Sequence, residues 1–309
     1  MIAINDLSLD FAGNIIFNNI SLQVKKTDRI GLIGNNGSGK TTLLNLISKK
    51  IAPTNGSISY SKNLKIAYLP QELNFNPNIN LKGYVIGNSS KIIELDKQID
   101  KINGLLSKEK LEKKQFELIN ELEKIQNEKD SMNILELEIN SEKIMKGLGF
   151  SNTDFEKNIN NLSGGWKMRA ELSRLLVLNP DIILLDEPTN HLDLPAIIWL
   201  EKFLNSTKCA LILVSHDIKF LNKSINRIFD VSQNTINDFK GNYSKYIIHR
   251  EKEIERQIKQ KKNQDKYIKQ ANMLIDKFRY KKNKAAFAQT LIRRLKKIDK
   301  IKVDNFDIS

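Results

Sequence analysis

The sequence is poor in features that mark secreted or membrane proteins. Its one cysteine, Cys209, excludes an internal disulfide, and its apolar, strand-like surroundings indicate a buried structural thiol rather than a nucleophile. No apolar run approaches the roughly 20 residues that a membrane-spanning helix needs. The N-terminus has neither the basic start nor the apolar core of a signal peptide. These absences predict a cytoplasmic protein with no membrane segment.

Aromatic residues are also scarce, at 7% of the 309 residues, but hydrophobic residues reach 40%, enough to exclude a disordered polypeptide. Acidic residues are scarce in one place only. Residues 245–303 carry 20 Lys and Arg against 6 Asp and Glu, which accounts for the whole net charge of +14. The rest of the chain is neutral, so one segment alone is suited to a polyanionic partner.

A glycine-rich turn is the first motif that carries chemistry. Residues 34–41 (GNNGSGKT) follow a short apolar run at 29–33 and precede an apolar-faced helix expected over 42–48. Strand, glycine-rich turn and helix in this order predict a phosphate-binding loop. Lys40 is expected to reach the β- and γ-phosphates, and Thr41 to help hold Mg²⁺. The predicted ATP-binding residues here are Gly34, Asn35, Asn36, Gly37, Ser38, Gly39, Lys40, Thr41 and Thr42.

Two carboxylates end a strand-like run at residues 181–187. Consecutive apolar positions predict a strand that is buried on both faces, and open α/β sheets bind ligands at the carboxyl ends of such strands. Asp186 is expected to hold Mg²⁺, and Glu187 to deprotonate the attacking water. A second apolar run, residues 210–214, is closely followed by His216.

Further motifs follow in a fixed order: Gln71, then residues 162–166 (LSGGW), 190–193 (NHLD) and 214–217 (VSHD). Together with the phosphate loop they resemble the ATP-binding cassette (ABC) superfamily. The resemblance implies an α/β P-loop NTPase fold of the ABC type. It also implies that Gln71 senses Mg²⁺ and the attacking water, that His216 contacts the γ-phosphate, and that Phe11 stacks on adenine. Phe17 is the competing aromatic residue.

One cassette of this kind is half of an enzyme. In the superfamily the residues at Ser163, Gly164 and Gly165 grip the γ-phosphate bound by an opposing cassette. Each motif occurs once here. The resemblance therefore implies a second cassette, supplied in trans or in a full-length tandem chain.

Residues 162–169 (LSGGWKMR), 190–193 and 241–244 (GNYS) resemble the ABC-F group more narrowly. This group comprises soluble tandem-cassette ATPases that act on ribosomes. The gap between Gln71 and the signature is expected to hold a charged helical hairpin at about 88–130, in the place of the group's arm. A surface insertion without a partner is the alternative. The expected organisation is an ABC ATPase domain at 1–240, a basic helical-pair linker at 241–303, and the start of a missing second cassette at 304–309.

The basic segment is expected to be an antiparallel helical pair. Residues 243–278 read as one long helix, and apolar residues spaced 3, 4, 3 recur at Ala288, Leu291, Leu295 and Ile298. A basic tip with two aromatics lies between the helices and suits structured RNA. The predicted nucleic-acid-binding residues are Lys277, Arg279, Tyr280, Lys281, Lys282, Lys284, Arg293 and Arg294.

By resemblance, this tip reaches transfer RNA and ribosomal RNA from the ribosomal exit site, gated by ATP. Other functions stay open at this point: a DNA-structure-binding ATPase of genome maintenance, the ATPase subunit of a membrane transporter, or a half-protein that binds ATP without hydrolysing it. The basic pair could also act only as a spacer between cassettes, or bind an anionic membrane surface.

Overall fold

The computed structural model describes residues 1–11, 13–73, 78–87, 90–107, 112–131, 134–232, 234–278 and 285–299. The chain divides into two compact units, Met1–Tyr243 (unit 1) and Ser244–Ser309 (unit 2). The strands, all in unit 1, are β1 (Ile2–Phe11), β2 (Asn14–Val24), β3 (Arg29–Ile33), β4 (Asn55–Tyr60), β5 (Ile66–Leu69), β6 (Ile182–Asp186), β7 (Ala210–Val214), β8 (Arg227–Ser232) and β9 (Thr235–Lys240).

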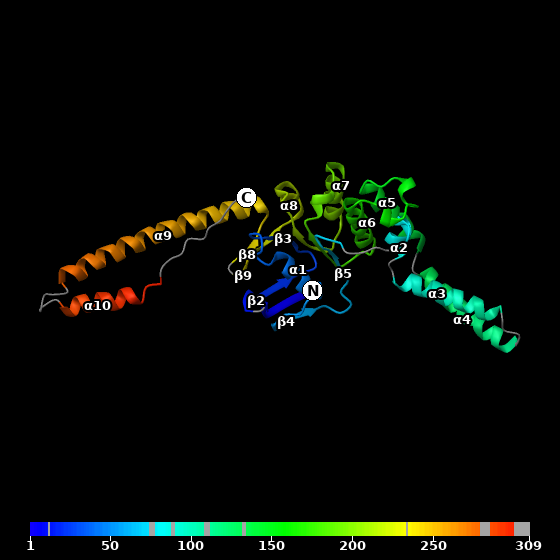
Figure 1. Ribbon diagram of the computed structural model, residues 1–309, viewed down its shortest axis with the longest axis horizontal. Coiled ribbons are helices and arrows are strands. Elements are labelled where there is room, and N and C mark those ends of the chain that lie inside the picture. The colour runs from blue at the N-terminus through cyan, green and yellow to red at the C-terminus, as the bar shows by residue number, and fades with distance from the viewer. Residues whose placement is uncertain are drawn as a thin grey trace. The chain divides into compact units, whose positions relative to one another are not determined.

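The helices of unit 1 gather around these strands and extend into a hairpin (Figure 1). They are α1 (Lys40–Ile47), α2 (Leu81–Gly87), α3 (Ser90–Leu106), α4 (Glu112–Ser131), α5 (Ile134–Gly147), α6 (Gly164–Val177), α7 (Leu194–Ser206) and α8 (Ile218–Ser224). Short 3-10 turns lie at η1 (Asn152–Asp154), η2 (Ile159–Asn161) and η3 (Pro188–His191).

The main sheet has six strands in the order β5-β6-β7-β3-β8-β9. Neighbours from β5 to β8 are parallel, and β9 pairs antiparallel with β8. Every residue of β6 and β7 is buried, as the unbroken apolar runs predicted. The parallel strands direct their carboxyl ends to one edge, which collects the phosphate loop, the two carboxylates and the histidine.

A second sheet, with the antiparallel order β2-β1-β4, shares one core with the main sheet. Phe17 on β2 and Leu43 and Leu44 on α1 are completely buried in this core. An added Cβ at Gly39 would lie 3.0 Å from the Phe17 ring. The second sheet therefore packs against the phosphate loop through the apolar side chain of Phe17.

Helices α3 and α4 lie side by side as the expected charged hairpin (Figure 1). Leu95, Ile102 and Ile125 form its small apolar core. Near its base, Tyr84 on α2 hydrogen-bonds Glu171 on α6, and Arg174 donates to both oxygens of the same carboxylate. This buried triad ties α2 to the helix that begins with the signature residues.

Unit 2 consists of α9 (Tyr243–Phe278) and α10 (Ala285–Lys296). Ala271 and Ile275 of α9 and Ala288 and Leu291 of α10 are buried, as expected for a paired apolar seam. The Gln264 amide donates to the Asp299 carbonyl at 2.9 Å, so the end of the described chain lies beside the middle of α9. The predicted architecture, an α/β domain with an inserted helical hairpin and a separate helical pair, is confirmed.

Two expectations about details are wrong. Cys209 precedes β7 and is only half-buried, with its thiol donating to the Thr207 hydroxyl at 3.3 Å. The apolar run that suggested burial belongs to the strand after it. Ile298 lies beyond the end of α10 rather than within the helix. No helix in the described ranges combines the length and apolar character of a membrane span.

Candidate nucleotide site

The phosphate loop connects β3 to α1 through three glycines in the left-handed region, Gly34 (φ 149°), Gly37 (φ 78°) and Gly39 (φ 105°). A Cβ at Gly34 would lie 2.4 Å from the Val231 carbonyl oxygen, so only glycine allows the loop to pass β8 this closely. Lys40 begins α1, and its ammonium donates to the Gly34 and Asn35 carbonyls at 2.8 and 3.0 Å. These bonds hold the cation over the loop, where phosphate oxygens would meet it.

The residues expected to bind Mg²⁺ come from two elements that the sheet brings together. Thr41 Oγ1 donates to Asp186 Oδ2 at 2.7 Å, across 145 residues of sequence. Hydroxyl and carboxylate oxygens are the ligands that Mg²⁺ prefers, usually together with phosphate and water. The described residues contain no group of three His, Cys, Asp or Glu side chains suited to a metal. The donor set therefore fits an ion shared with a bound phosphate rather than a caged one.

Within the loop, the buried Ser38 hydroxyl has no hydrogen-bond partner in the structure. A buried polar atom without a partner is costly and calls for an explanation. A phosphate oxygen held by the surrounding loop would provide one. The loop thus fits the group that its sequence predicts.

Glu187 directly follows β6 and occupies the left-handed region (φ 52°), which is rare for a side chain of this size. Only 7% of the residue is exposed. One carboxylate oxygen accepts from the His216 amide at 3.2 Å, and the other lies 3.4 Å from His216 Nε2. The strained backbone, fixed by the Glu187 amide donating to the Val214 carbonyl at 3.0 Å, directs the carboxylate toward the histidine.

Burial shifts the ionisation of the charged groups at this edge. It raises the pKa of Glu187, against the opposing effect of His216. It also raises the pKa of Asp186, while the Thr41 hydrogen bond and Lys40 act in the other direction. Burial lowers the pKa of Lys40, and the two carboxylates counteract that shift. A carboxylate with a raised pKa is a better proton acceptor, which suits Glu187 as a base.

Two other predicted residues lie at the margins of this edge. Gln71 is exposed and follows β5, whose Leu69 pairs with Leu185 of β6, so it lies next to the strand that carries the carboxylates. Phe11 ends β1 and is 52% exposed, whereas Phe17 is fully buried beneath the loop. Of the two aromatics, Phe11 alone has a face free to stack on a base.

The signature residues begin α6. Ser163 occupies the N-cap position, and its side chain makes no capping hydrogen bond. Ser163 and Gly164 are exposed, and a Cβ at Gly164 would meet nothing within 4 Å. The helix N-terminus and a free hydroxyl are thus presented outward, as an anion-binding group would be.

Of the predicted nucleic-acid contacts, Lys277 at the end of α9 and Arg293 and Arg294 on α10 are exposed. The others lie outside the described residues: Arg279, Tyr280, Lys281, Lys282 and Lys284.

Comparison with known proteins agrees with this geometry. A family model described as "ABC transporter" matches residues 17–190, more than half of the chain, and an extension model with the same description matches residues 229–308. The chain belongs to the ABC transporter family. This ABC cassette is 32% identical over 301 residues to the probable ATP-binding protein YheS of Escherichia coli K12, covering 97% of the chain and 45% of that protein.

Two further relatives indicate to which group within the ABC family the chain belongs. ABC transporter F family member 2 of Arabidopsis thaliana is 30% identical, over 89% of the chain and 41% of that protein. The uncharacterised ABC transporter ATP-binding protein YfmM of Bacillus subtilis is 31% identical, over 97% and 57%. The expected membership of the ABC-F group is confirmed. The cassette spans about half the length of these relatives.

Solved structures share the fold at low identity. The ATP-binding subunit of an ABC transporter matches with a TM-score of 0.57 and 17% identity, over 78% of the cassette chain and 90% of the other. The ATP-binding cassette MJ0796, a dimer in a post-hydrolysis state bound to ADP and Pi, matches with a TM-score of 0.55 and 20% identity, over 78% and 98%.

The structure also brings together residues that the motifs alone did not single out. Arg169, within the predicted signature segment, stacks on Trp166 and bonds the segment that follows Glu187. In the sequence, the two residues belong to the 162–169 motif, and their spacing of three residues on one helix places them on the same face. Thr189 and Ser215 join their hydroxyls at 3.2 Å beside Glu187, which links the turns after β6 and β7.

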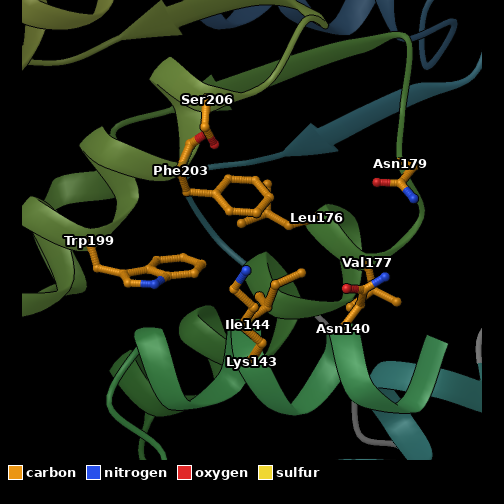
Figure 2. A pocket seen from close by; sticks show the side chains of 9 residues that line it. All are labelled: Asn140, Lys143, Ile144, Leu176, Val177, Asn179, Trp199, Phe203 and Ser206. Carbon is orange, nitrogen blue, oxygen red and sulfur yellow. The ribbon is translucent and has the colours of Figure 1, made fainter. Parts of the chain in front are cut away.

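A pocket of about 160 Å³ lies away from this chemistry, among α5, α6 and α7. Figure 2 shows the ring of Phe203 turned toward Leu176, with Trp199 beside Ile144. None of its nine lining residues belongs to a phosphate motif.

Proposed function

We propose that the cassette hydrolyses ATP with Glu187 as the general base. The observation that carries this proposal is the convergence of Thr41, Asp186, Glu187 and His216 at one sheet edge, beside the Lys40 loop. Glu187 accepts a proton from the attacking water, and His216 holds the carboxylate in place. Lys40 and the loop amides bind the β- and γ-phosphates.

Mg²⁺ would supply positive charge to the β- and γ-phosphate oxygens. In this proposal Thr41 and Asp186, already 2.7 Å apart, hold the ion, and Gln71 approaches it from the end of β5. Phe11 stacks on the adenine ring, since Phe17 is committed to the core. Thr41 and Asp186 are already in contact across the sheet edge, whereas the roles of Gln71 and Phe11 are proposed from the family motifs.

The site is completed by a second cassette, in trans or in a tandem chain. Ser163 and Gly164 are exposed at the start of α6, and together with the half-buried Gly165 they are suited to grip the γ-phosphate on the opposing Lys40 loop. The dimeric arrangement of the fold relative MJ0796 supports such pairing. ATP would then act as the connection between two cassettes, and hydrolysis would release them.

Unit 2 is proposed to bind the ribosome in the exit-site region, through transfer RNA and ribosomal RNA. Support comes from the excess of 14 positive charges in residues 245–303 and from the exposed Lys277, Arg293 and Arg294. The apolar residues of the seam, such as Ala271 and Leu291, are occupied in pairing α9 with α10, and the exposed charges are the proposed recognition surface. ATP-driven closure would gate this binding and so modulate translation.

A sedimentation experiment tests the proposal. Glu187→Gln removes the base and keeps the ATP-binding loop, so the variant should remain on ribosomes when ATP is present. The double variant Glu187→Gln with Lys40→Ala cannot hold ATP and serves as the control. Retention by the single variant alone supports the proposal. Equal retention of wild type and Glu187→Gln, or displacement by branched DNA at concentrations where ribosomes do not compete, would contradict it.

A further inference from the structure

Arg169 on α6 is a buried arginine that joins three segments of unit 1. Its Nε donates to the His191 carbonyl at 3.2 Å, and its Nη1 donates to the Leu148 carbonyl at 3.1 Å. The same Nη1 lies 3.5 Å from Asp193 Oδ2. The guanidinium therefore connects α6 to the end of α5 and to the segment that leads from η3 into α7.

The flat face of this guanidinium is packed against an aromatic ring, in addition to the hydrogen bonds that its N–H groups make. Its centre lies 4.5 Å from the Trp166 ring, and Trp166 packs at 4.8 Å against Phe150. Arg169 thus combines cation–π stacking on Trp166 with hydrogen bonds to two carbonyls. Only arginine has the planar side chain with several donors that this combination requires. Gly149 (φ 96°) shapes the turn beside it, where a Cβ would lie 3.0 Å from Nη1.

This network joins two functional segments, the signature end of α6 and the turn that follows Glu187. Ser163, the N-cap of α6, precedes Arg169 by less than two helical turns. On the other side, His191 ends η3, which begins directly after Glu187. Asp193 also accepts from the Ala196 amide at 3.1 Å as the N-cap of α7.

We propose that Arg169, covered by Trp166, is a positioning residue that couples the signature end of α6 to the Glu187 turn of the same cassette. The inference rests on the proposed function, in which the signature serves the opposing ATP and Glu187 serves its own. Through Arg169, nucleotide at one site changes the presentation of the signature to the other site. ATP binding at one site would thereby affect ATP binding at the other.

The neighbouring packing transmits this coupling between helices. The Trp199 ring of α7 lies against Gly147 at the end of α5, so closely that an added Cβ would be 2.0 Å from it. Together with the contacts of Arg169 to the Leu148 carbonyl and to Asp193, this packing joins α6, the end of α5 and α7. A displacement of η3 is then transmitted to α6 instead of being absorbed by a loose loop.

Arg174 offers a matched control on the same helix. It is similarly enclosed, with 18% of its side chain exposed against 10% for Arg169, and it pairs with Glu171 at 2.5 Å. Among the described residues, its hydrogen bonds run to Glu171 on the same helix and not to η3 or α7. Loss of either arginine should destabilise α6, but only loss of Arg169 should uncouple it from Glu187.

The test measures amide hydrogen exchange of peptides from the first turns of α6, with and without a non-hydrolysable ATP analogue and Mg²⁺. The 309-residue chain is kept dilute enough to be monomeric by light scattering. The analogue should slow exchange in the parent chain and in Arg174→Met. In Arg169→Met this response should be lost, while affinity for the analogue stays within about threefold. Arg169→Lys keeps the charge without the fork and should retain a partial response.

The outcomes are separable. Persistence of the response in Arg169→Met, or no response of α6 in the parent chain, overturns the inference. If Arg169→Met fails to fold, a full response in Arg169→Lys overturns it equally. If the response depends on Arg169 but ATP never pairs two chains at high concentration, the coupling stands and the two-cassette function fails.

Discussion

Units 1 and 2 use charge in opposite ways. Unit 1 places its functional charges singly and buries them, as with Asp186 and Glu187, each held by a specific partner. Unit 2 exposes many like charges along two helices that share a narrow apolar seam. Function in unit 1 should therefore depend on the geometry of individual atoms, and function in unit 2 on the sum of charges.

The strongest effect is expected from Glu187→Gln. Loss of the base should lower the ATP hydrolysis rate by about 10²–10⁴-fold, the usual contribution of a positioned general base. ATP binding should be preserved, because the Lys40 loop is unchanged. Steady-state hydrolysis and equilibrium binding of a fluorescent ATP analogue measure the two quantities. A rate within a few-fold of wild type would remove Glu187 from the mechanism.

The packing between the helices of unit 1 should tolerate an added methyl group poorly. Gly147→Ala places a methyl group 2.0 Å from the Trp199 ring and should destabilise unit 1 by about 1–3 kcal/mol. Gly104→Ala, inside α3, meets nothing within 4 Å and should stabilise by about 0.5–1 kcal/mol. Urea unfolding of both variants gives the two free energies. A Gly147→Ala variant as stable as wild type would show that Trp199 can move aside freely.

In unit 2, removing charges should have a smaller, graded effect. Arg293→Gln with Arg294→Gln should lower RNA affinity several-fold and reduce the slope of log affinity against log salt by about 1 per lost phosphate contact. Lys113→Gln with Lys114→Gln on α4 removes two exposed charges outside unit 2 and serves as the control. An unchanged slope in the arginine variant, or equal losses in both pairs, would contradict the assignment of RNA binding to unit 2.

The smallest effect concerns pH. Since burial raises the pKa of Glu187, its ionised, basic form is lost as pH falls through a value above the usual range for glutamate. Hydrolysis should therefore decline on the acid side earlier than an ordinary glutamate would dictate. A pH–rate profile at saturating ATP shows this limb. Glu187→Gln should abolish it, and persistence of the limb would assign it to another group.

The sequence predicted those parts of the site that depend on local order. Lys40 and Thr41 follow a strand and begin a helix, and β6 and β7 are unbroken apolar runs, so their positions could be inferred from periodicity and family motifs. The second sheet and the strand order were not predicted. They depend on pairings such as that of β1 with β4, which no local pattern fixes.

The left-handed turn at Glu187 and the Arg169 network also could not be inferred. Both result from contacts between segments more than 20 residues apart, such as Arg169 with the His191 carbonyl. The prediction for Cys209 relied too much on local pattern. Its burial was inferred from neighbouring residues that belong to the next element. Local pattern predicted the elements of the site, and long-range packing determined how they are joined.

The central claim is that each ATP lies between the Lys40 loop of one cassette and the signature of another. A mixing experiment tests it most directly. Lys40→Ala disables the loop, and Gly164→Asp, at a position with open space around it, places a negative charge where the opposing phosphate would lie. Each variant alone should be inactive, and the mixture should recover hydrolysis from one intact composite site. Wild-type activity of Gly164→Asp alone, or no recovery on mixing, would contradict the claim.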